Sequence, residues 1–214
     1  MIAMIGSDKI DRYMESCRTE FWQKVFRIEL EYILKHLVKS EEVLSVGCGP
    51  AIIERALSEY GFSLTGLDVS REALECAPDG VRTVAARAED MPFPASSFDA
   101  VICVASLQFI EDFRKALDET TRVLRPKGKL LVMLLNPESD FIKKKLRDPN
   151  SYVHEIKHTD LRKIEAAIAE NYGIHEEYLL GVKGDAVYNS RDVNEPVLYV
   201  IRGTKKPVKK DKDA

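Results

Sequence analysis

Residues 43–51 read Val-Leu-Ser-Val-Gly-Cys-Gly-Pro-Ala, and the next apolar run ends at Asp68. The first four residues are typical of a short strand, and apolar residues then recur at helical spacing from Ile53 until Gly61 ends the pattern. A sharp turn between that strand and that helix brings backbone N–H groups to the carboxyl end of a parallel sheet. Asp68 follows the first glycine by about 20 residues, where a carboxylate can accept the hydroxyls of a ribose. The pattern therefore predicts an adenosine-containing cofactor.

The spacing of the glycines distinguishes between cofactor classes. Nicotinamide and flavin sites use G-x-G-x-x-G, in which the third glycine lets the helix pack close beneath a pyrophosphate. Ile52 occupies that third position, which disfavours a nicotinamide-dependent oxidoreductase. The pattern is instead G-x-G-x-small and ends at Ala51, which suits a ligand without a pyrophosphate. We expect Pro50 in the first turn of the helix, and Ala51 without a positive φ.

Four segments resemble, in order, the class I S-adenosylmethionine-dependent methyltransferases of the small type 11 kind. They lie between residues 42 and 136 and read VLSVGCGPAIIERAL, GLDVS, AEDMPFPASSFDAVICVASLQFIED and TRVLRPKGKLLVMLLN. The resemblance implies that the methionine half of the cofactor lies against the glycine turn and that the ribose lies on the acid after the second strand. It also implies adenine beside the loop after the third strand, and the transferable methyl group at the end of the fourth. The residues at these cofactor positions are Gly47, Cys48, Gly49, Asp68, Val69, Arg87, Ala88, Glu89, Val104, Ala105 and Gln108.

Besides Ala51, which replaces a glycine of the family, two positions depart from the family pattern. Ser45 stands where the family usually has an acid that helps to hold the ammonium end of the cofactor. Arg87 stands where an acid usually meets the adenine amine, and a guanidinium offers that amine no acceptor. Glu89 or a backbone carbonyl is then the candidate replacement. These departures motivate an alternative function, a degenerate S-adenosylmethionine-binding scaffold or regulatory protein without turnover.

The order of strand-like and helical patterns predicts an α/β fold. Strand-like segments alternate with mostly helical stretches, which favours a doubly wound, Rossmann-like parallel sheet with helices on both faces. The last two strand-like segments have no helix between them and predict an antiparallel C-terminal hairpin at the sheet edge, for seven strands in all. The segments are 43–46, 62–67, 81–86, 98–104, 129–135, 174–182 and 197–201. We expect an N-terminal helical cap at 1–40, a methyltransferase-like domain at 41–203 and a flexible lysine-rich tail at 204–214.

Composition limits the partners. The 214 residues, 45% of them hydrophobic, suffice for one α/β domain. A net charge of −3 gives no global attraction to nucleic acid, although a nucleic-acid arm is an alternative for the tail. The longest apolar run, residues 130–135, is much shorter than the ~20 residues of a membrane helix. With no secretory pattern at the N-terminus, we expect a cytoplasmic protein that does not enter membranes and acts on a small molecule.

The four cysteines, at positions 17, 48, 76 and 103, are widely spaced and form no C-x-x-C pair. We expect reduced thiols that pack as small apolar side chains. The functional alternatives place Cys48 beside the cofactor sulfonium or make Cys17 a ligand for a soft metal or arsenic.

Two further segments bear on the substrate. Residues 7–38 predict two helices, which by the resemblance would cap the cofactor, with Tyr13, Phe21 and Trp22 as lid residues or simply as packing against the sheet edge. Residues 136–159 follow the fifth strand and would also border the site. In this segment, the weak candidates for a general base are Tyr152, His154 and His158, with surface histidines as the alternative.

Residues 154–158 read H-E-x-x-H, the zinc-protease motif, which needs a continuous helix. Pro149 lies just upstream, and Thr159 and Asp160 have the sequence of a cap for the next helix. We therefore predict a connection rather than a helix at 154–158, and no metal site.

Overall fold

Two helices precede the sheet. A computed structural model of the protein describes residues 7–39, 41–184, 186–190 and 195–207. Helix α1 spans Ser7–Cys17 and α2 spans Glu20–His36, which confirms the predicted pair of helices. They are separate because Thr19 takes an extended conformation and its side chain accepts a hydrogen bond from the N–H of Trp22, which caps α2.

The central part of the chain alternates strands with helices, as predicted. Strand β1 pairs in parallel with β2 on one side and with β4 on the other. β5 begins at Leu124, before the predicted residue 129, because the chain leaves α5 directly into the sheet and pairs Leu124 with Phe98. The elements are β1 (Glu42–Val46), α3 (Ile52–Glu59), β2 (Ser63–Asp68), α4 (Arg71–Glu75), β3 (Arg82–Ala85), β4 (Phe98–Val104), η1 (Leu107–Phe109), α5 (Phe113–Val123) and β5 (Leu124–Leu135).

The C-terminal part adds antiparallel strands, with two corrections. The described residues form an eight-stranded sheet of order β3-β2-β1-β4-β5-β8-β6-β7, not one of seven strands. The last long strand is not at the edge, because β8 lies between β5 and β6 and is antiparallel to both. The edge strand β7 is too short for a sequence pattern. The elements are α6 (Asp140–Lys145), η2 (Tyr152–Glu155), α7 (Leu161–Asn171), β6 (Tyr172–Lys183), β7 (Ala186–Tyr188) and β8 (Pro196–Lys205).

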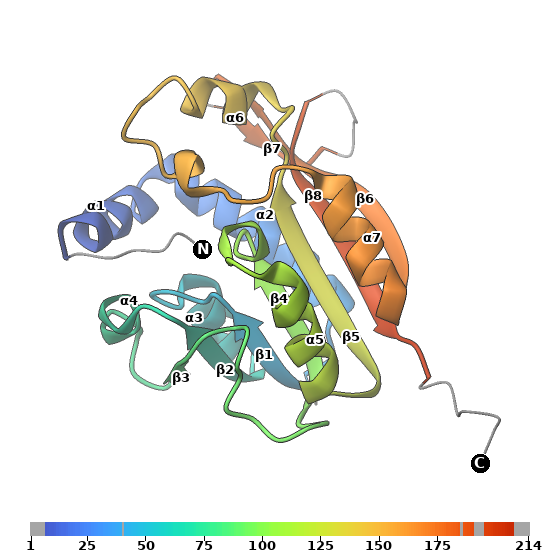
Figure 1. The fold of residues 1–214 in the computed structure, drawn as a ribbon. Coiled ribbons are helices and arrows are strands. Elements are labelled where there is room, and N and C mark those ends of the chain that lie inside the picture. The colour runs from blue at the N-terminus through green and yellow to red at the C-terminus, as the bar shows by residue number, and fades with distance from the viewer. Residues whose placement is uncertain (1–6, 40, 185, 191–194, 208–214) are drawn as a thin grey trace, which may run out of the picture.

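Successive residues of β4 contribute to two separate cores. Ala100 and Ile102 pack in a cluster with residues of α2 and α3. Val101 and Cys103 point the other way and pack in a cluster with residues of α5 and α7. Figure 1 shows α5 and α7 on one face of the sheet and α2 and α3 on the other. The sheet is therefore covered on both faces, as the doubly wound fold requires.

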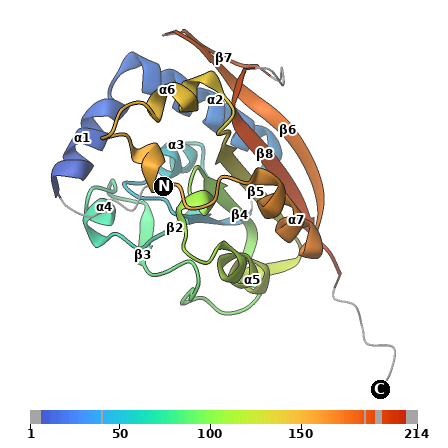
Figure 2. The same ribbon diagram turned by 45° about the horizontal axis from the view of Figure 1, so that its top comes forward.

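The parallel strands all end on the same side of the sheet, which we call its carboxyl edge. β1 ends at Val46, β2 at Asp68 and β4 at Val104, all at this edge. Helices α1 and α6 and the segment that holds η2 gather at the same end of the molecule (Figure 2). Ligands of open α/β folds bind outside this edge.

The end of β8 corrects the predicted tail boundary. Thr204 and Lys205 belong to the strand, and the Lys205 ammonium donates to the carbonyl of Leu124 at 2.6 Å. The remainder of the predicted tail from residue 208 onward lies outside the described residues. Within the described ranges, no helix has both the length and the apolar character needed to cross a bilayer.

Candidate functional site

The turn of residues 47–51, hereafter the glycine turn, joins β1 to α3. Gly47 and Gly49 have positive φ angles of 74° and 49°, a region open to residues without a Cβ. Ala51 follows with a φ of 55°, so our expectation that it would not need a positive φ was wrong. Helix α3 begins only after Ala51, and Pro50 therefore lies in the turn rather than in the first helical turn.

Hydrogen bonds and packing hold the glycine turn against the end of β2. The N–H groups of Gly47 and Cys48 both donate to the carbonyl of Leu67, at 2.7 and 3.1 Å. The Cys48 side chain packs directly over Gly66, where an added Cβ would lie 2.6 Å from the Cys48 sulfur. The turn is therefore a rigid platform.

Asp68 ends β2 and is 5% exposed. One of its carboxylate oxygens accepts the N–H of Gly49 at 2.8 Å, and the other accepts the N–H of Ser70 at 2.9 Å. Because a carboxylate offers about four acceptor positions, two N–H donors orient it and leave capacity for a ligand. The predicted ribose acid is thus fixed in direction by the glycine turn itself.

A cavity opens beside this residue, and we call it the Asp68 cavity. It is bordered by the ends of β1 and β2, the loop after β3 and the segment around η1. The structure brings together here the predicted cofactor residues Gly47, Asp68, Val69, Arg87, Ala88 and Glu89.

The two charged residues of the loop after β3 point in different directions. Arg87 is paired with Glu89 at 2.7 Å, but the Arg87 side chain is 61% exposed whereas that of Glu89 is 8% exposed. The carboxylate therefore faces the protein and the guanidinium faces outward. An acid is present at this side of the cavity even though Arg87 occupies the usual acidic position.

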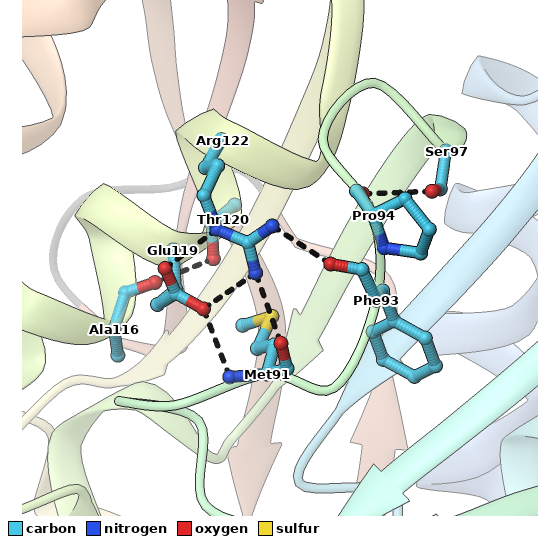
Figure 3. A network of polar contacts seen from close by, with 8 residues as sticks. All are labelled: Met91, Phe93, Pro94, Ser97, Ala116, Glu119, Thr120 and Arg122. Carbon is cyan, nitrogen blue, oxygen red and sulfur yellow. Dashed lines mark hydrogen bonds and ion pairs between the residues drawn. The ribbon is translucent and has the colours of Figure 1, made fainter.

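Helix α5 holds the next part of this loop in place (Figure 3). The Arg122 guanidinium donates to the carbonyls of Met91 and Phe93, at 2.9 and 2.7 Å, and to the Glu119 carboxylate. Glu119 in turn accepts the N–H of Met91 at 2.9 Å. The loop that borders the Asp68 cavity is thus anchored to α5 by its backbone.

A second cavity lies on the other side of Gly47, and we call it the aromatic cavity. The empty space that it bounds, including open solvent at its mouth, is about 890 Å³. It contains the predicted cofactor residues Gly47, Cys48, Val104 and Ala105. The three lid candidates Tyr13, Phe21 and Trp22 also line it. Gly47 lines both cavities, so a ligand can extend from one to the other across a backbone without a side chain.

A buried hydrogen bond joins Ser45 at the end of β1 to Glu54 in the first turn of α3. The Ser45 hydroxyl donates to a carboxylate oxygen of Glu54 at 2.5 Å, and both residues line the aromatic cavity. Burial raises the pKa of Glu54 to about 7, although the hydrogen bond from Ser45 opposes the shift. The acid missing from the strand is therefore supplied by the helix.

Glu29 of α2 brings a second carboxylic acid to the aromatic cavity. It is 5% exposed and has no hydrogen-bond or ion-pair partner among the described residues. Burial, and then the negative charge of Glu54, raise the pKa of Glu29 to about 8. Glu29 and Glu54 lie on the apolar stripes of their helices, with Val25 and Ile33 in one case and Leu57 in the other. An acid within an apolar stripe was the sequence signal for both, and our sequence reasoning missed it.

Only one of the three candidate bases reaches a cavity that holds cofactor residues. Tyr152 lines the aromatic cavity, and burial raises its pKa well above the usual range. His154 donates from its ring to the carbonyl of Asp148 at 3.0 Å. His158 donates to the carbonyl of Ile110 at 2.9 Å. The structure does not bring either histidine to the Asp68 cavity or the aromatic cavity.

The H-E-x-x-H segment is not an α-helix. Residues Tyr152–Glu155 form a single 3-10 turn, and the chain is then irregular until α7 begins at Leu161. The prediction of a connection is confirmed. A pair of histidines on one helical face, which the zinc motif requires, is not formed.

Gln108 lines neither the Asp68 cavity nor the aromatic cavity, and its contacts are structural. Its side chain is fully buried and exchanges two hydrogen bonds with the backbone of Leu135, at 2.6 and 3.0 Å. The backbone carbonyl of Gln108 accepts hydrogen bonds from the N–H groups of Lys157 and His158. Gln108 thus ties η1 to the end of β5 and to the segment before α7.

The four cysteines are free thiols. Cys48 is buried within the glycine turn, and burial raises its pKa well above the usual range, with a further contribution from Glu54. Burial also raises the pKa of Cys17 to about 11. Neutral, buried thiols of this kind act as small apolar side chains.

Comparison with known proteins identifies the domain. A family model described as a methyltransferase domain matches residues 44–132. Sterol 4-C-methyltransferase strm-1 of Caenorhabditis elegans is 32% identical over 123 residues, which cover 52% of this chain and 37% of the relative. Demethylmenaquinone methyltransferase of Tropheryma whipplei is 35% identical over 97 residues, or 43% of this chain and 41% of the relative. The match thus spans less than half the length of these two relatives.

A solved structure extends the likeness to almost the whole fold. A SAM-dependent methyltransferase from Thermotoga maritima, described as a possible histamine N-methyltransferase, superimposes with a TM-score of 0.78 at 20% identity. The superposition covers 92% of this chain and 96% of that one. The cofactor of this family is S-adenosylmethionine. Residues 44–132 therefore match the methyltransferase domain of type 11, and the fold around them is that of class I S-adenosylmethionine-dependent methyltransferases.

Proposed function

We propose that the protein transfers a methyl group from S-adenosylmethionine to a small-molecule acceptor. The observation that carries this proposal is the position of Gly47 between two cavities of different character. The Asp68 cavity has acids suited to an adenosine, and the aromatic cavity is walled mostly by apolar and aromatic side chains around two buried acids, Glu29 and Glu54. A cofactor that crosses Gly47 would carry its reactive end from the first cavity to the second.

The residues of the Asp68 cavity fit an adenosine. Asp68 keeps acceptor capacity for ribose hydroxyls after its two backbone hydrogen bonds. Glu89 is the buried partner of an outward-facing Arg87, so a carboxylate rather than a guanidinium is available to an adenine amine. Asp68 and Glu89 are the residues that would hold the nucleoside half.

The residues on the other side of Gly47 fit the methionine half. Glu54, held by Ser45, would take the ammonium group in place of the family's strand-end acid. The backbone of the glycine turn would lie beneath the chain, and Val104 and Ala105 would border the methyl group. The two departures that motivated a scaffold without turnover, Ser45 and Arg87, each have a nearby acid, so neither departure argues against cofactor binding.

When bound, S-adenosylmethionine supplies a methyl group on a cationic sulfur, so that an acceptor lone pair forms the new bond and the sulfur keeps the electrons of the broken one. The protein then has to align the acceptor and exclude water, an effect that can lower the barrier by several kcal/mol. The rings of Phe21, Trp22 and Phe141 would exclude water on the acceptor side. This division of labour needs no nucleophile or triad.

The small size of the acceptor is inferred from the aromatic cavity. Its described lining contains no lysine, arginine or histidine, which disfavours a polynucleotide whose phosphates would need basic partners. The named acceptors of the relatives differ from one another, as a sterol and demethylmenaquinone do. Because the match covers less than half of those relatives, neither acceptor is transferred to this chain.

Calorimetry with S-adenosylmethionine, S-adenosylhomocysteine and NAD tests the proposal. We expect both sulfur compounds to bind and NAD not to bind. Absence of binding by both sulfur compounds at millimolar concentration would overturn the proposal. Tight binding without a methylated product, monitored by mass spectrometry over a panel of acceptors, would favour the scaffold. A ligand that copurifies with the protein would be identified by the same mass spectrometry.

A further inference from the structure

The aromatic cavity is walled by rings from separate segments. Phe21, Trp22 and Phe26 come from α2, Phe141 from α6, Tyr13 from α1 and Tyr152 from η2. The rings support one another: Phe21 stacks on Phe141 with centroids 5.6 Å apart, and Trp22 stacks on Phe26 at 6.0 Å. A ligand in this cavity would therefore meet ring faces and edges on several sides.

The ionisable side chains that line the aromatic cavity are acidic. Its described lining contains two carboxylic acids, Glu29 and Glu54, and no basic side chain. Glu54 is accounted for by Ser45 and by the cofactor ammonium proposed above. Glu29 is only 5% exposed, yet it forms neither a hydrogen bond nor an ion pair with any described residue.

An unpaired carboxylate among aromatic rings is costly unless something compensates for it. Burial of a charged group without a partner costs several kcal/mol, and carboxylates in such places are paired or become protonated. The groups near Glu29 on the neighbouring elements are Tyr13, Cys17, Glu54 and Tyr152, all neutral or acidic. Without a ligand, the raised pKa of Glu29 keeps it largely as the neutral acid below about pH 8, and the described lining holds no cation that could pair with the ionised carboxylate, so a cationic ligand is the partner that would.

We propose that the methyl acceptor is an organic amine, whose ammonium group binds against Glu29 and whose hydrocarbon part lies among the rings of the aromatic cavity. This inference rests on the proposed methyl transfer. Aromatic faces attract cations through their quadrupoles, most strongly in desolvated sites, so that rings and carboxylate select the same kind of ligand. A neutral acceptor could at most form a hydrogen bond with Glu29, and an anionic acceptor would be repelled by its carboxylate.

The proton balance of the transfer also gives Glu29 a role. An ammonium nitrogen has no lone pair until it loses a proton, and Glu29 would accept that proton on its carboxylate. The freed lone pair forms the bond to the methyl carbon, the sulfur keeps the electron pair of the broken bond, and the methylated nitrogen carries the positive charge. Glu29 then returns its proton to solvent. The pKa of Glu29, raised to about 8, suits proton exchange near neutral pH.

The test uses the full chain and its single tryptophan, Trp22, which lines the cavity and reports on its occupancy by fluorescence. The protein is first saturated with S-adenosylhomocysteine, whose binding is measured separately by calorimetry. It is then titrated with 2-phenylethylamine and, in parallel, with the neutral 2-phenylethanol. We expect the amine to bind about tenfold to a hundredfold more tightly, because hydrogen bonds to charged groups contribute about 1.5–3 kcal/mol.

Two variants locate the effect. Glu29→Gln should remove the preference for the amine and leave the affinity for the alcohol unchanged. Glu31→Gln, on the exposed face of the same helix, should behave like the unmodified chain. Equal affinity for the two probes, or a preference that persists in Glu29→Gln, would overturn the amine inference and leave the methyl transfer standing. Failure to bind S-adenosylhomocysteine would overturn the methyl transfer and the inference with it. The probe comparison on the unmodified chain does not depend on any variant folding.

Discussion

The Ser45 hydroxyl donates a hydrogen bond of 2.5 Å to the buried carboxylate of Glu54, across the turn between β1 and α3. In the sequence, Ser45 appears to remove an acid that the family usually has, and Glu54 gives no sign of replacing it. A serine at the end of β1 leaves room for an acid from α3, and the two together present a carboxylate beside the glycine turn. The electrostatic requirement of the cofactor site can thus be met from a different element.

Replacing Glu54 tests whether this acid of α3 does the work of the acid that the family usually has at the position of Ser45. Glu54→Gln keeps the shape and the possibility of a hydrogen bond to Ser45 but removes the negative charge. We expect the affinity for S-adenosylhomocysteine, measured by calorimetry, to fall about tenfold or more, as expected for loss of a charged hydrogen-bond partner. Glu59→Gln is the matched control, because Glu59 is 64% exposed at the end of the same helix. Unchanged affinity in Glu54→Gln would remove Glu54 from the cofactor site.

Glu29 should make stability depend on pH. Its pKa rises from 4.5 to about 8 on folding, so between these values the folded chain holds a proton that the unfolded chain has lost. Stability should therefore fall as the pH rises through this window, by up to about a few kcal/mol. Glu29→Gln removes this term. Thermal melts of the variant and the unmodified chain should nearly coincide near pH 4 and separate progressively toward pH 8, with the variant more stable. In Glu31→Gln, a separation of the same size would contradict the assignment to Glu29.

Arg122 should support the Asp68 cavity without touching a ligand. Arg122→Gln breaks the hydrogen bonds that hold the carbonyls of Met91 and Phe93 (Figure 3). Because the guanidinium is partly exposed, we expect a loss of only about 1–2 kcal/mol in denaturant unfolding and a few-fold weaker binding of S-adenosylhomocysteine. Arg114→Gln is the control, since Arg114 lies on α5 like Arg122 but makes only an exposed ion pair with Glu170 of α7. Equal effects of the two variants would argue against a specific role of the anchored loop.

The contact between Gly66 and Cys48 predicts a coupled pair of substitutions. Gly66→Ala places a methyl group 2.6 Å from the Cys48 sulfur and should cost about 1–3 kcal/mol of stability through overpacking. Cys48→Ala removes that sulfur, so the double variant should recover part of the loss. Denaturant unfolding of the two single variants and the double variant gives the coupling energy. Strict additivity would mean that the cost of Gly66→Ala arises elsewhere in the strand.

Much of the cofactor side could be predicted because its signals are local. A strand, a glycine turn and a helix follow one another in residues 43–59, and β2 ends in an acid, so the turn and Asp68 must meet at one sheet edge. The positive φ of Ala51 could not be predicted, because the small side chain permits other conformations and the path of the chain into α3 selects this one.

The acceptor side could not be predicted in the same way. The sequence by itself determined the α/β alternation, the adenosine-type turn and the family resemblance, because these depend on periodicity and on residues close in the chain. Only the tertiary structure decided that β8 enters the sheet between β5 and β6, since strand order is set by pairing between distant segments. The tertiary structure also decided that Glu54 is hydrogen-bonded to Ser45. It left Glu29 unpaired among aromatic rings from α1, α2, α6 and η2. The burial of an acid depends on what packs against its helix, and that packing arises from segments far apart in the chain.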